Sequence, residues 1–277
     1  MYLIVQSPHL TDADISALAA LTDATEYAQL GAGAVRLRAH PSTPGIAVFC
    51  AARNLDFAWV PEQRKLASVG LVAMDMDSTL ITIECIDEIA DMQGIKPQVA
   101  AITASAMRGE IDFAESLRRR VGLLAGLDVA ALQRVYDERL RLSPGAEAML
   151  AAFRAVGAQS LLVSGGFTFF TERLKERLGL DHTVSNVLEV ESGKLSGRIS
   201  GPIVDALVKA EALRRLSATP PMQGKLTVGI GDGANDLPML AVADVSVAYH
   251  AKPLVREKTT HQVDYCGLDA VINLFVR

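Results

Sequence analysis

Four short segments of the chain are almost continuously apolar, and they constrain the fold more than any other feature. They are residues 69–74, 161–163, 226–230 and 245–248. A strand that is covered on both faces has such a composition, whereas a strand with one solvated face alternates apolar and polar residues. Segments with helical periodicity lie between these strands. Alternating strands and helices predict right-handed βαβ units and therefore an α/β fold with a doubly wound parallel sheet.

The chain divides into units of different texture. Residues 1–68 mix short apolar runs with one helical pattern, which predicts a small α+β N-terminal domain that serves either regulation or dimerisation and packing. The polar stretch 61–65 is typical of a linker. Residues 86–142 contain several helical patterns and no strand pattern, which predicts a helical cap inserted into the core. The catalytic core would then comprise residues 69–85 and 143–277.

Composition excludes several classes of protein. The chain has 277 residues, of which 50% are hydrophobic, and its 27 Lys and Arg against 32 Asp and Glu give a net charge of -5. A disordered chain is therefore disfavoured. Because there is no basic tail or stripe to displace counterions from a phosphate backbone, we expect no nucleic-acid partner.

The cysteines and the apolar runs bear on the location of the protein. Its three cysteines are widely spaced and form no C-x-x-C pair, which disfavours a disulfide framework and a thiolate zinc site. The first ten residues lack the features of a signal peptide, and the longest apolar runs are far shorter than the ~20 residues of a membrane-spanning helix. We therefore expect a cytoplasmic protein without a membrane partner.

Two acidic clusters follow predicted strands. Asp75 and Asp77 come after the first strand, and Asp232 and Asp236 follow the third within a Gly-rich segment. Carboxylates at the end of a buried strand need a cation, because desolvation and mutual repulsion penalise ionisation. Mg²⁺ suits such a set of hard oxygen ligands. The alternative is a turn that ends the strand, with the aspartates capping the next helix.

A phosphate site is also indicated. Ser164, Gly165 and Gly166 follow the second predicted strand and precede a helix, where a hydroxyl and exposed backbone N–H groups can bind phosphate. A plain turn is the alternative. Lys209 is one of several lysines that could neutralise phosphoryl charge, and by itself it is equally typical of a solvated surface.

Taken together, the motifs resemble those of a known family. The motifs are Asp75-Met76-Asp77-Ser78-Thr79, Ser164-Gly165-Gly166, Lys209 within residues 204–209, and Gly231-Asp232-Gly233-Ala234-Asn235-Asp236. In this order they resemble the four motifs of the haloacid dehalogenase (HAD) superfamily, and most closely those of phosphoserine phosphatases. The resemblance extends from about residue 69 to the C-terminus and implies a HAD-like Rossmannoid core.

The resemblance implies a two-step hydrolysis through an aspartyl-phosphate. Asp75 would be the nucleophile, and Asp77 would protonate the leaving oxygen and then deprotonate the attacking water. Mg²⁺ would be held by the Asp75 carboxylate, the Asp77 carbonyl and Asp232.

The same resemblance implies which residues bind the phosphate. Ser164, Gly165 and Lys209 would bind its equatorial oxygens. Asn235 would lie near the phosphate and the attacking water, and Asp236 would support the metal's water shell or Lys209.

The cap supplies evidence on the substrate. If residues 112–125 form a helix, one stripe contains Phe113, Leu117, Arg120 and Leu124. Arg120 lies in the middle of this apolar stripe and needs an anion, whereas Arg118 and Arg119 point elsewhere and suit a solvated face. Glu84 seeks a cation, or else begins a cap helix. In the family, the position of Glu84 binds the substrate ammonium, and Phe113 and Arg120 also match cap positions.

One anion-seeking and one cation-seeking group fit a zwitterionic amino acid. The resemblance thus implies a Mg²⁺-dependent phosphomonoesterase that converts O-phospho-L-serine to L-serine and phosphate, the last step of serine biosynthesis. Alternatives are a HAD phosphatase or phosphotransferase acting on another small phosphorylated metabolite, and a phospho-accepting receiver domain. The sequence also allows a homodimer.

Overall fold

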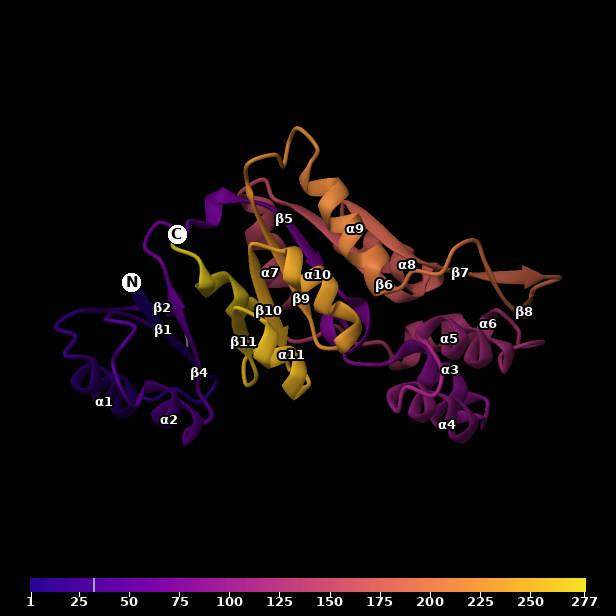
Figure 1. Ribbon diagram of the computed structural model, residues 1–277, viewed down its shortest axis with the longest axis horizontal. Coiled ribbons are helices and arrows are strands. Elements are labelled where there is room, and N and C mark those ends of the chain that lie inside the picture. Colours follow the sequence, from indigo (N-terminus) through magenta and orange to yellow (C-terminus); the bar gives the residue numbers. More distant parts are fainter. Residues whose placement is uncertain (32) are drawn as a thin grey trace.

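The computed structural model describes residues 1–31 and 33–277, and its strands form two separate sheets (Figure 1). Seven strands make the larger sheet in the order β11-β10-β9-β5-β6-β7-β8. All of its pairings are parallel except the antiparallel pairing of β7 with β8. The predicted α/β class with a mostly parallel sheet is therefore confirmed.

The strands of the larger sheet are β5 (Val69–Met74), β6 (Gln159–Phe167), β7 (His182–Glu191), β8 (Lys194–Ser200), β9 (Leu226–Gly231), β10 (Val245–Tyr249) and β11 (His261–Val263). The four apolar segments are β5, β6, β9 and β10. Strand β6 is longer than predicted because it continues through Ser164-Gly165-Gly166 to Phe167.

Helices cover both faces of this sheet. The helices of the core are α7 (Ala146–Ala155), α8 (Thr168–Leu178), α9 (Ala206–Ser217), α10 (Leu237–Val242) and α11 (Pro253–Lys258), together with the 3-10 helix Leu268–Leu274. Leu71 and Ala73 of β5 pack with residues of α9 and α10. Val72 and Met74 belong to the cluster that contains the apolar side chains of α7 and α8. Every residue of β5 is buried, which explains its continuous apolar sequence.

The sequence did not predict β7, β8 and β11. Strand β7 is mostly half-buried or exposed and carries polar residues, and β8 has three exposed residues among its seven. Such strands lack the continuous apolar signal of the buried ones. Helix α9 begins at Ala206, because Asp205 is its N-cap and accepts hydrogen bonds from the N–H groups of Leu207 and Val208.

A group of helices follows β5 and lies at the opposite end of the molecule from the N-terminus (Figure 1). They are α3 (Cys85–Met92), α4 (Lys96–Met107), α5 (Phe113–Gly122) and α6 (Ala130–Arg134), continued by a π-helix at Val135–Arg139. The β7–β8 hairpin bonds to this group, since Gly126 N–H donates to Leu195 O and Leu195 N–H donates to Leu127 O, both at 2.8 Å. We therefore propose that the cap comprises residues 86–142 with this hairpin as an added support.

The smaller sheet lies at the N-terminal end and has the antiparallel order β2-β3-β1-β4. Its elements are β1 (Tyr2–Gln6), α1 (Asp12–Thr22), β2 (Tyr27–Gly31), β3 (Ala34–Arg38), α2 (Ile46–Ala51) and β4 (Asp56–Val60). One face packs against α1 and α2 through residues such as Leu3 and Val5. On the other face, Ile4, Ala58 and Val60 belong to the main core cluster of the larger sheet.

The segment between the two sheets is not a free linker. Leu66 N–H donates to Val276 O at 3.0 Å, and Val276 N–H donates to Arg64 O at 2.8 Å. A 3-10 turn, Leu66–Ser68, then leads into β5. These bonds attach the segment to the C-terminal end of the chain.

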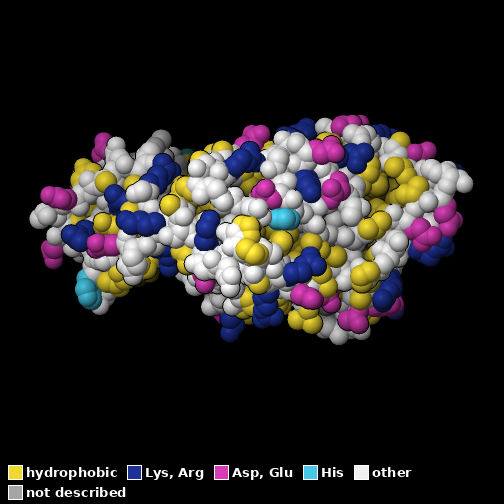
Figure 2. All heavy atoms as spheres, turned by 90° about the horizontal axis from the view of Figure 1, so that it is seen from above, with side chains coloured by type: hydrophobic (Ala, Val, Ile, Leu, Met, Phe, Trp, Pro, Cys, Tyr) yellow, Lys and Arg dark blue, Asp and Glu magenta, His cyan; other side chains and the backbone are white. Residues whose placement is uncertain are grey.

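Charges of both signs are interspersed over the face of the molecule that Figure 2 shows. This agrees with the absence of a basic stripe from the sequence. In the described ranges, the helices are all too short or too polar to cross a membrane.

Candidate active site

The carboxyl ends of β9, β5 and β6 lie side by side because these strands are neighbours in the larger sheet. Asp232 follows β9, Asp75 follows β5, and Ser164 lies near the end of β6. All three residues line one cavity of about 340 Å³, together with residues of the cap. Nine of the eleven predicted site residues line it, and the other two, Lys209 and Asp236, are buried next to Asp75.

Asp75 is held by two donors. Its Oδ1 accepts a hydrogen bond from the Met76 N–H at 2.8 Å and lies 2.7 Å from Lys209 Nζ. Lys209 Nζ also donates to Asp236 Oδ1 at 2.7 Å. The side chain of Lys209 is only 1% exposed, so α9 presents it to the carboxylates and not to solvent.

Burial and neighbouring charges have opposing effects on the pKa values of Asp75 and Lys209. Burial and the neighbouring Asp236 raise the pKa of Asp75 well above its ordinary value, and Lys209 only partly offsets them. Burial lowers the pKa of Lys209, but the Asp236 and Asp75 carboxylates outweigh it and the net shift is upward. The lysine therefore stays charged, and it lies between two carboxyl groups, those of Asp75 and Asp236.

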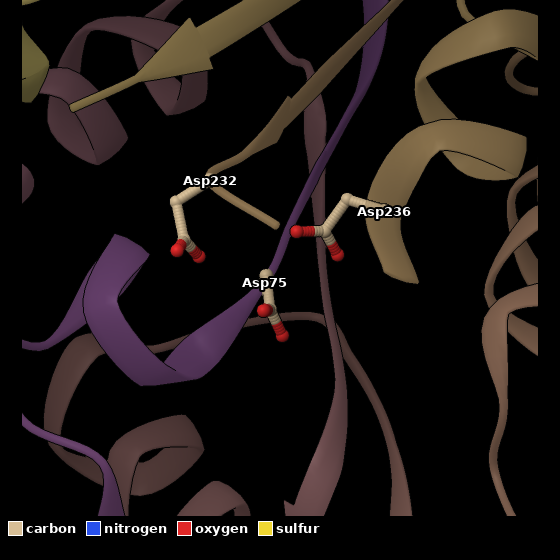
Figure 3. A group of neighbouring side chains, drawn as sticks. All are labelled: Asp75, Asp232 and Asp236. Carbon is tan, nitrogen blue, oxygen red and sulfur yellow. The ribbon is translucent and has the colours of Figure 1, made fainter. Parts of the chain in front are cut away.

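Three carboxylates can share a cation here (Figure 3). Asp75, Asp232 and Asp236 each place one oxygen within 4.8 Å of the others. Burial, and then the Asp236 charge, raise the pKa of Asp232 to about 6. Within the described part of the chain, Lys209 is the one ammonium group at ion-pair distance from this cluster. Hard oxygen donors with uncompensated charge suit a divalent metal ion.

Asp236 is the most fully engaged of the three. Its Oδ1 accepts from Lys209, its Oδ2 accepts from the Gly233 N–H at 3.0 Å, and the residue is fully buried. Asp232 is more accessible, and its Oδ1 accepts from Thr79 Oγ1 at 3.2 Å. These contacts are compatible with the supporting part predicted for Asp236, which stays a prediction.

Asp77 lies in the turn that follows β5. Its Oδ1 accepts a hydrogen bond from the Cys85 N–H at 2.8 Å, at the start of α3. Burial, and then the charge of Glu84, raise the pKa of Asp77 to about 7. A carboxyl group with such a pKa exchanges protons readily near neutral pH.

The two glycines near the end of β6 allow neighbouring side chains to come close to the backbone. Ser164 Oγ accepts from the Gly166 N–H at 2.8 Å, and Asn186 Nδ2 donates to Gly165 O at 2.8 Å. A Cβ atom on Gly166 would lie 2.9 Å from Asp77 Oδ2, so a larger residue would displace the acid. Asn235 comes from the short helix after β9 and also lines the cavity.

Helix α5 supplies several of the cap residues that line the cavity. It begins at Phe113 with Asp112 as N-cap, where Asp112 Oδ1 accepts from the Glu115 N–H at 2.7 Å. Phe113 meets the Ser164-Gly165-Gly166 segment of β6, because a Cβ atom on Gly165 would lie 2.9 Å from its Cζ. The cap therefore contacts the core in this structure.

The two charged groups predicted to select the substrate both line the cavity. Burial lowers the pKa of Arg120, and its guanidinium forms no ion pair within 4.0 Å among residues 1–31 and 33–277. Glu84 Oε1 accepts from Ser78 Oγ at 2.8 Å. By contrast, Arg119 pairs with Glu115 on the exposed side of α5, as predicted for a solvated position.

Several lining residues were missed by the sequence reasoning. They are Met107 and Thr103 of α4, Ser116 of α5, and Lys252 after β10. Met107 is 73% exposed at the end of its helix, and nothing in the local sequence distinguishes it from a surface methionine. Ser116 could have been found, since it lies three residues after Phe113 and four before Arg120 on the same helical face.

Comparison with known proteins gives consistent results. The family model of haloacid dehalogenase-like hydrolases matches residues 72–241, and a domain of unknown function, DUF4072, matches residues 3–43. The chain is 48% identical over 237 residues to a phosphoserine phosphatase from Polaromonas sp., covering 84% of this chain and 97% of that relative.

Solved structures extend the similarity to the whole fold. A probable phosphoserine phosphatase from Vibrio cholerae in its unliganded form superposes with a TM-score of 0.85 at 38% identity, over 99% of this chain and 85% of that one. A substrate-bound phosphoserine phosphatase gives a TM-score of 0.68 at 34% identity, over 75% of this chain and 99% of that one.

Proposed function

Because this chain belongs to the phosphoserine phosphatases, a family of haloacid dehalogenase-like hydrolases, we propose that it hydrolyses O-phospho-L-serine to L-serine and phosphate. The reaction would be the last step of serine biosynthesis. The observation that carries the choice of substrate is the Arg120 guanidinium, which has no ion-pair partner among residues 1–31 and 33–277 and lines the same cavity as Glu84 and Asp75.

The polar groups of the cavity match the parts of phosphoserine. Lys209, Ser164 and the N–H groups near the end of β6 would bind the phosphate beside Asp75, with Asn235 near the water. Arg120 would bind the substrate carboxylate with its planar fork, and Glu84 would bind the ammonium. Phe113 would cover the small substrate from the cap side.

The proposed chemistry has two steps. In the first, an Asp75 oxygen attacks phosphorus, the bond from phosphorus to the serine oxygen breaks, and Asp77 gives that oxygen a proton. In the second, a water oxygen attacks phosphorus, Asp77 takes the water's proton, and the bond from phosphorus to Asp75 breaks. The raised pKa of Asp77 suits a group that must be protonated in one step and ionised in the next.

A magnesium ion fits the carboxylate cluster. Asp75, Asp232 and the Asp77 main-chain carbonyl would hold it, and it would offset charge between phosphate and nucleophile. Asp236 would act through Lys209 and the metal's water shell.

The test is a phosphate-release assay on the full chain with phosphorylated amino acids and sugars. We expect turnover of O-phospho-L-serine with Mg²⁺, loss of turnover in EDTA, and recovery on adding Mg²⁺ again. Faster hydrolysis of sugar phosphates would instead favour a phosphatase of another small metabolite. A single phosphorylation without turnover would favour a receiver domain. A cytoplasmic location and a homodimer stay predictions of the sequence.

A further inference from the structure

Ser116 of α5 has a buried hydroxyl group that the described residues leave without a hydrogen-bond partner. The residue is 1% exposed and lines the active-site cavity. Two other buried polar atoms among the described residues lack a hydrogen-bond partner, His261 Nδ1 and Asp264 Oδ1; the latter lies 3.2 Å from Arg256 Nη2, and neither residue lines the cavity. Because a buried polar group without a partner is costly, such a group in a binding cavity points to a ligand.

The helix itself does not satisfy this hydroxyl. A serine or threonine within a helix commonly donates to the carbonyl one turn earlier. Thr103 of α4, which lines the same cavity, does so with Val99 O at 3.1 Å. Ser116 donates only its backbone N–H to Asp112 O, at 3.0 Å, and its hydroxyl makes no bond within the described ranges.

The neighbour of Ser116 one turn later is Arg120. Its Nε donates to Ser116 O at 3.4 Å, so the guanidinium lies against this serine. Both side chains are on the cavity face of α5, and among the described residues neither is paired with an anion. A carboxylate offers about four acceptor positions, of which an arginine fork takes two.

We propose that the Ser116 hydroxyl donates a hydrogen bond to the carboxylate of the bound substrate, next to Arg120. Ser116 is then a specificity-determining residue that selects a phosphorylated amino acid over other phosphate esters. Ser116 lies against the Arg120 guanidinium, so its hydroxyl is better placed to donate to the anionic carboxylate of the substrate than to contact the cationic ammonium. The ammonium is therefore assigned to Glu84. This inference rests on the proposed function.

The test compares Ser116→Ala with the unmodified chain on two substrates, O-phospho-L-serine and 4-nitrophenyl phosphate, which has no carboxylate. A hydrogen bond to a charged group corresponds to about a 10- to 100-fold effect. We expect kcat/KM to fall by this factor on phosphoserine, mainly through KM, and to stay unchanged on the aryl phosphate. The Tm should not fall, because the variant removes an unsatisfied hydroxyl.

Three further variants make the test specific. Ser105→Ala is the matched control, since Ser105 is a half-buried serine of α4 whose hydroxyl accepts from Arg108 and which does not line the cavity, and it should change the hydrolysis of neither substrate. In an Arg120→Ala background, Ser116→Ala should have no further effect on phosphoserine, because the carboxylate is no longer held. If Ser116→Ala lowers Tm, Ser116→Cys, which keeps the volume with a weak donor, should show the same substrate pattern.

The outcomes separate this inference from the proposed function. No loss on phosphoserine, or equal losses on both substrates, overturns the role of Ser116 while the phosphatase activity stands. If the unmodified chain does not hydrolyse phosphoserine, the proposed function fails and this inference fails with it.

Discussion

Asp75 is positioned before any substrate binds, because the Met76 N–H and the Lys209 ammonium both hold its Oδ1. Positioned groups of this kind lower the barrier to attack, since the entropy of alignment is lost during folding instead of during the reaction. The same residue is difficult to replace. A side chain of equal shape without charge cannot form the bond to phosphorus.

Asp75→Asn is therefore expected to abolish steady turnover of phosphoserine. The amide is nearly isosteric, and Lys209 keeps its ion pair with Asp236 at 2.7 Å, so no buried charge is left without a partner and Tm should change little. Phosphate release and thermal unfolding measure the two effects. Asp137→Asn, at an exposed position, is the matched control and should keep full activity. Turnover by Asp75→Asn near the rate of the unmodified chain would exclude Asp75 as the nucleophile.

Asp77→Asn is expected to slow hydrolysis of phosphoserine by about 10²- to 10⁴-fold, because both proton transfers lose their donor or acceptor. The effect should depend on the leaving group. Nitrophenolate leaves without protonation, so 4-nitrophenyl phosphate should give a burst equal to the enzyme concentration, followed by slow turnover. Rapid-mixing absorbance measures the burst. Slow nitrophenolate release without any burst would argue that Asp77 serves the attack itself and not the proton transfers.

At the scale of elements, the buried strands could be predicted and the exposed ones could not. Strand β5 is covered on both faces, so its sequence is apolar throughout and it locates Asp75 directly. The β7–β8 hairpin forms one edge of the sheet, with β8 as the edge strand, and it contacts the cap, so its residues have mixed character. Its bonds to residues 126–129 depend on tertiary contacts that local periodicity does not encode.

The candidate site could likewise be predicted only in part. Carboxylates at strand ends could be predicted because the parallel topology brings those ends together. The burial of Lys209 could not, since residues 206–217 read as an ordinary amphipathic helix until the structure places that face against Asp75 and Asp236. Arg120 was identified because a charge within an apolar stripe conflicts with its local pattern.

One element of the N-terminal sheet is tied to the core by a buried carboxylate. Asp56 at the start of β4 is 5% exposed. Its oxygens accept from the N–H groups of Asp264, Tyr265 and Cys266, at 2.7, 3.0 and 3.0 Å. Hydrogen bonds to a charged group are worth more than neutral ones, and here three donors would lose their partner together.

Asp56→Ala is expected to lower the free energy of unfolding by about 3 kcal/mol. Asp56→Asn should lose less, since the amide keeps one acceptor oxygen. Urea denaturation measures both. Asp56 does not line the active-site cavity, so kcat should be unchanged under conditions where the variants are folded. Equal stability of Asp56→Ala and the unmodified chain would show that solvent replaces these bonds at no cost.

At the scale of the whole molecule, the N-terminal unit and the cap lie at opposite ends (Figure 1). One face of the smaller sheet shares its apolar core with the larger sheet through Ile4, Ala58 and Val60. We therefore propose that residues 1–68 form a packing domain for the C-terminal side of the core. Sensing of serine by this domain is the alternative, and it predicts a serine response that changes when this domain is altered.

The junction between the two units contains a buried histidine. His261 of β11 is 7% exposed, its Nε2 lies 2.6 Å from Arg64 Nη1, and its Nδ1 is unpartnered among the described residues. Burial, and then the Arg64 charge, lower the pKa of His261 from 6.5 to about 4. Between these two values the unfolded chain binds a proton that the folded chain excludes, so stability falls as pH is lowered through this range.

His261→Gln should remove this part of the pH dependence while its side-chain oxygen still accepts from Arg64. We expect the unmodified chain to lose about 3 kcal/mol more than the variant between pH 6.5 and pH 4. Urea denaturation across this range measures how steeply the free energy of unfolding changes with pH. This slope does not depend on whether the substitution also lowers stability at neutral pH. His9→Gln, at an exposed position, is the matched control and should keep the slope of the unmodified chain. If the free energies of unfolding of the unmodified chain and of His261→Gln change in parallel with pH, the junction opens enough to hydrate the imidazolium. The two units would then be less tightly packed than the shared core residues Ile4, Ala58 and Val60 indicate.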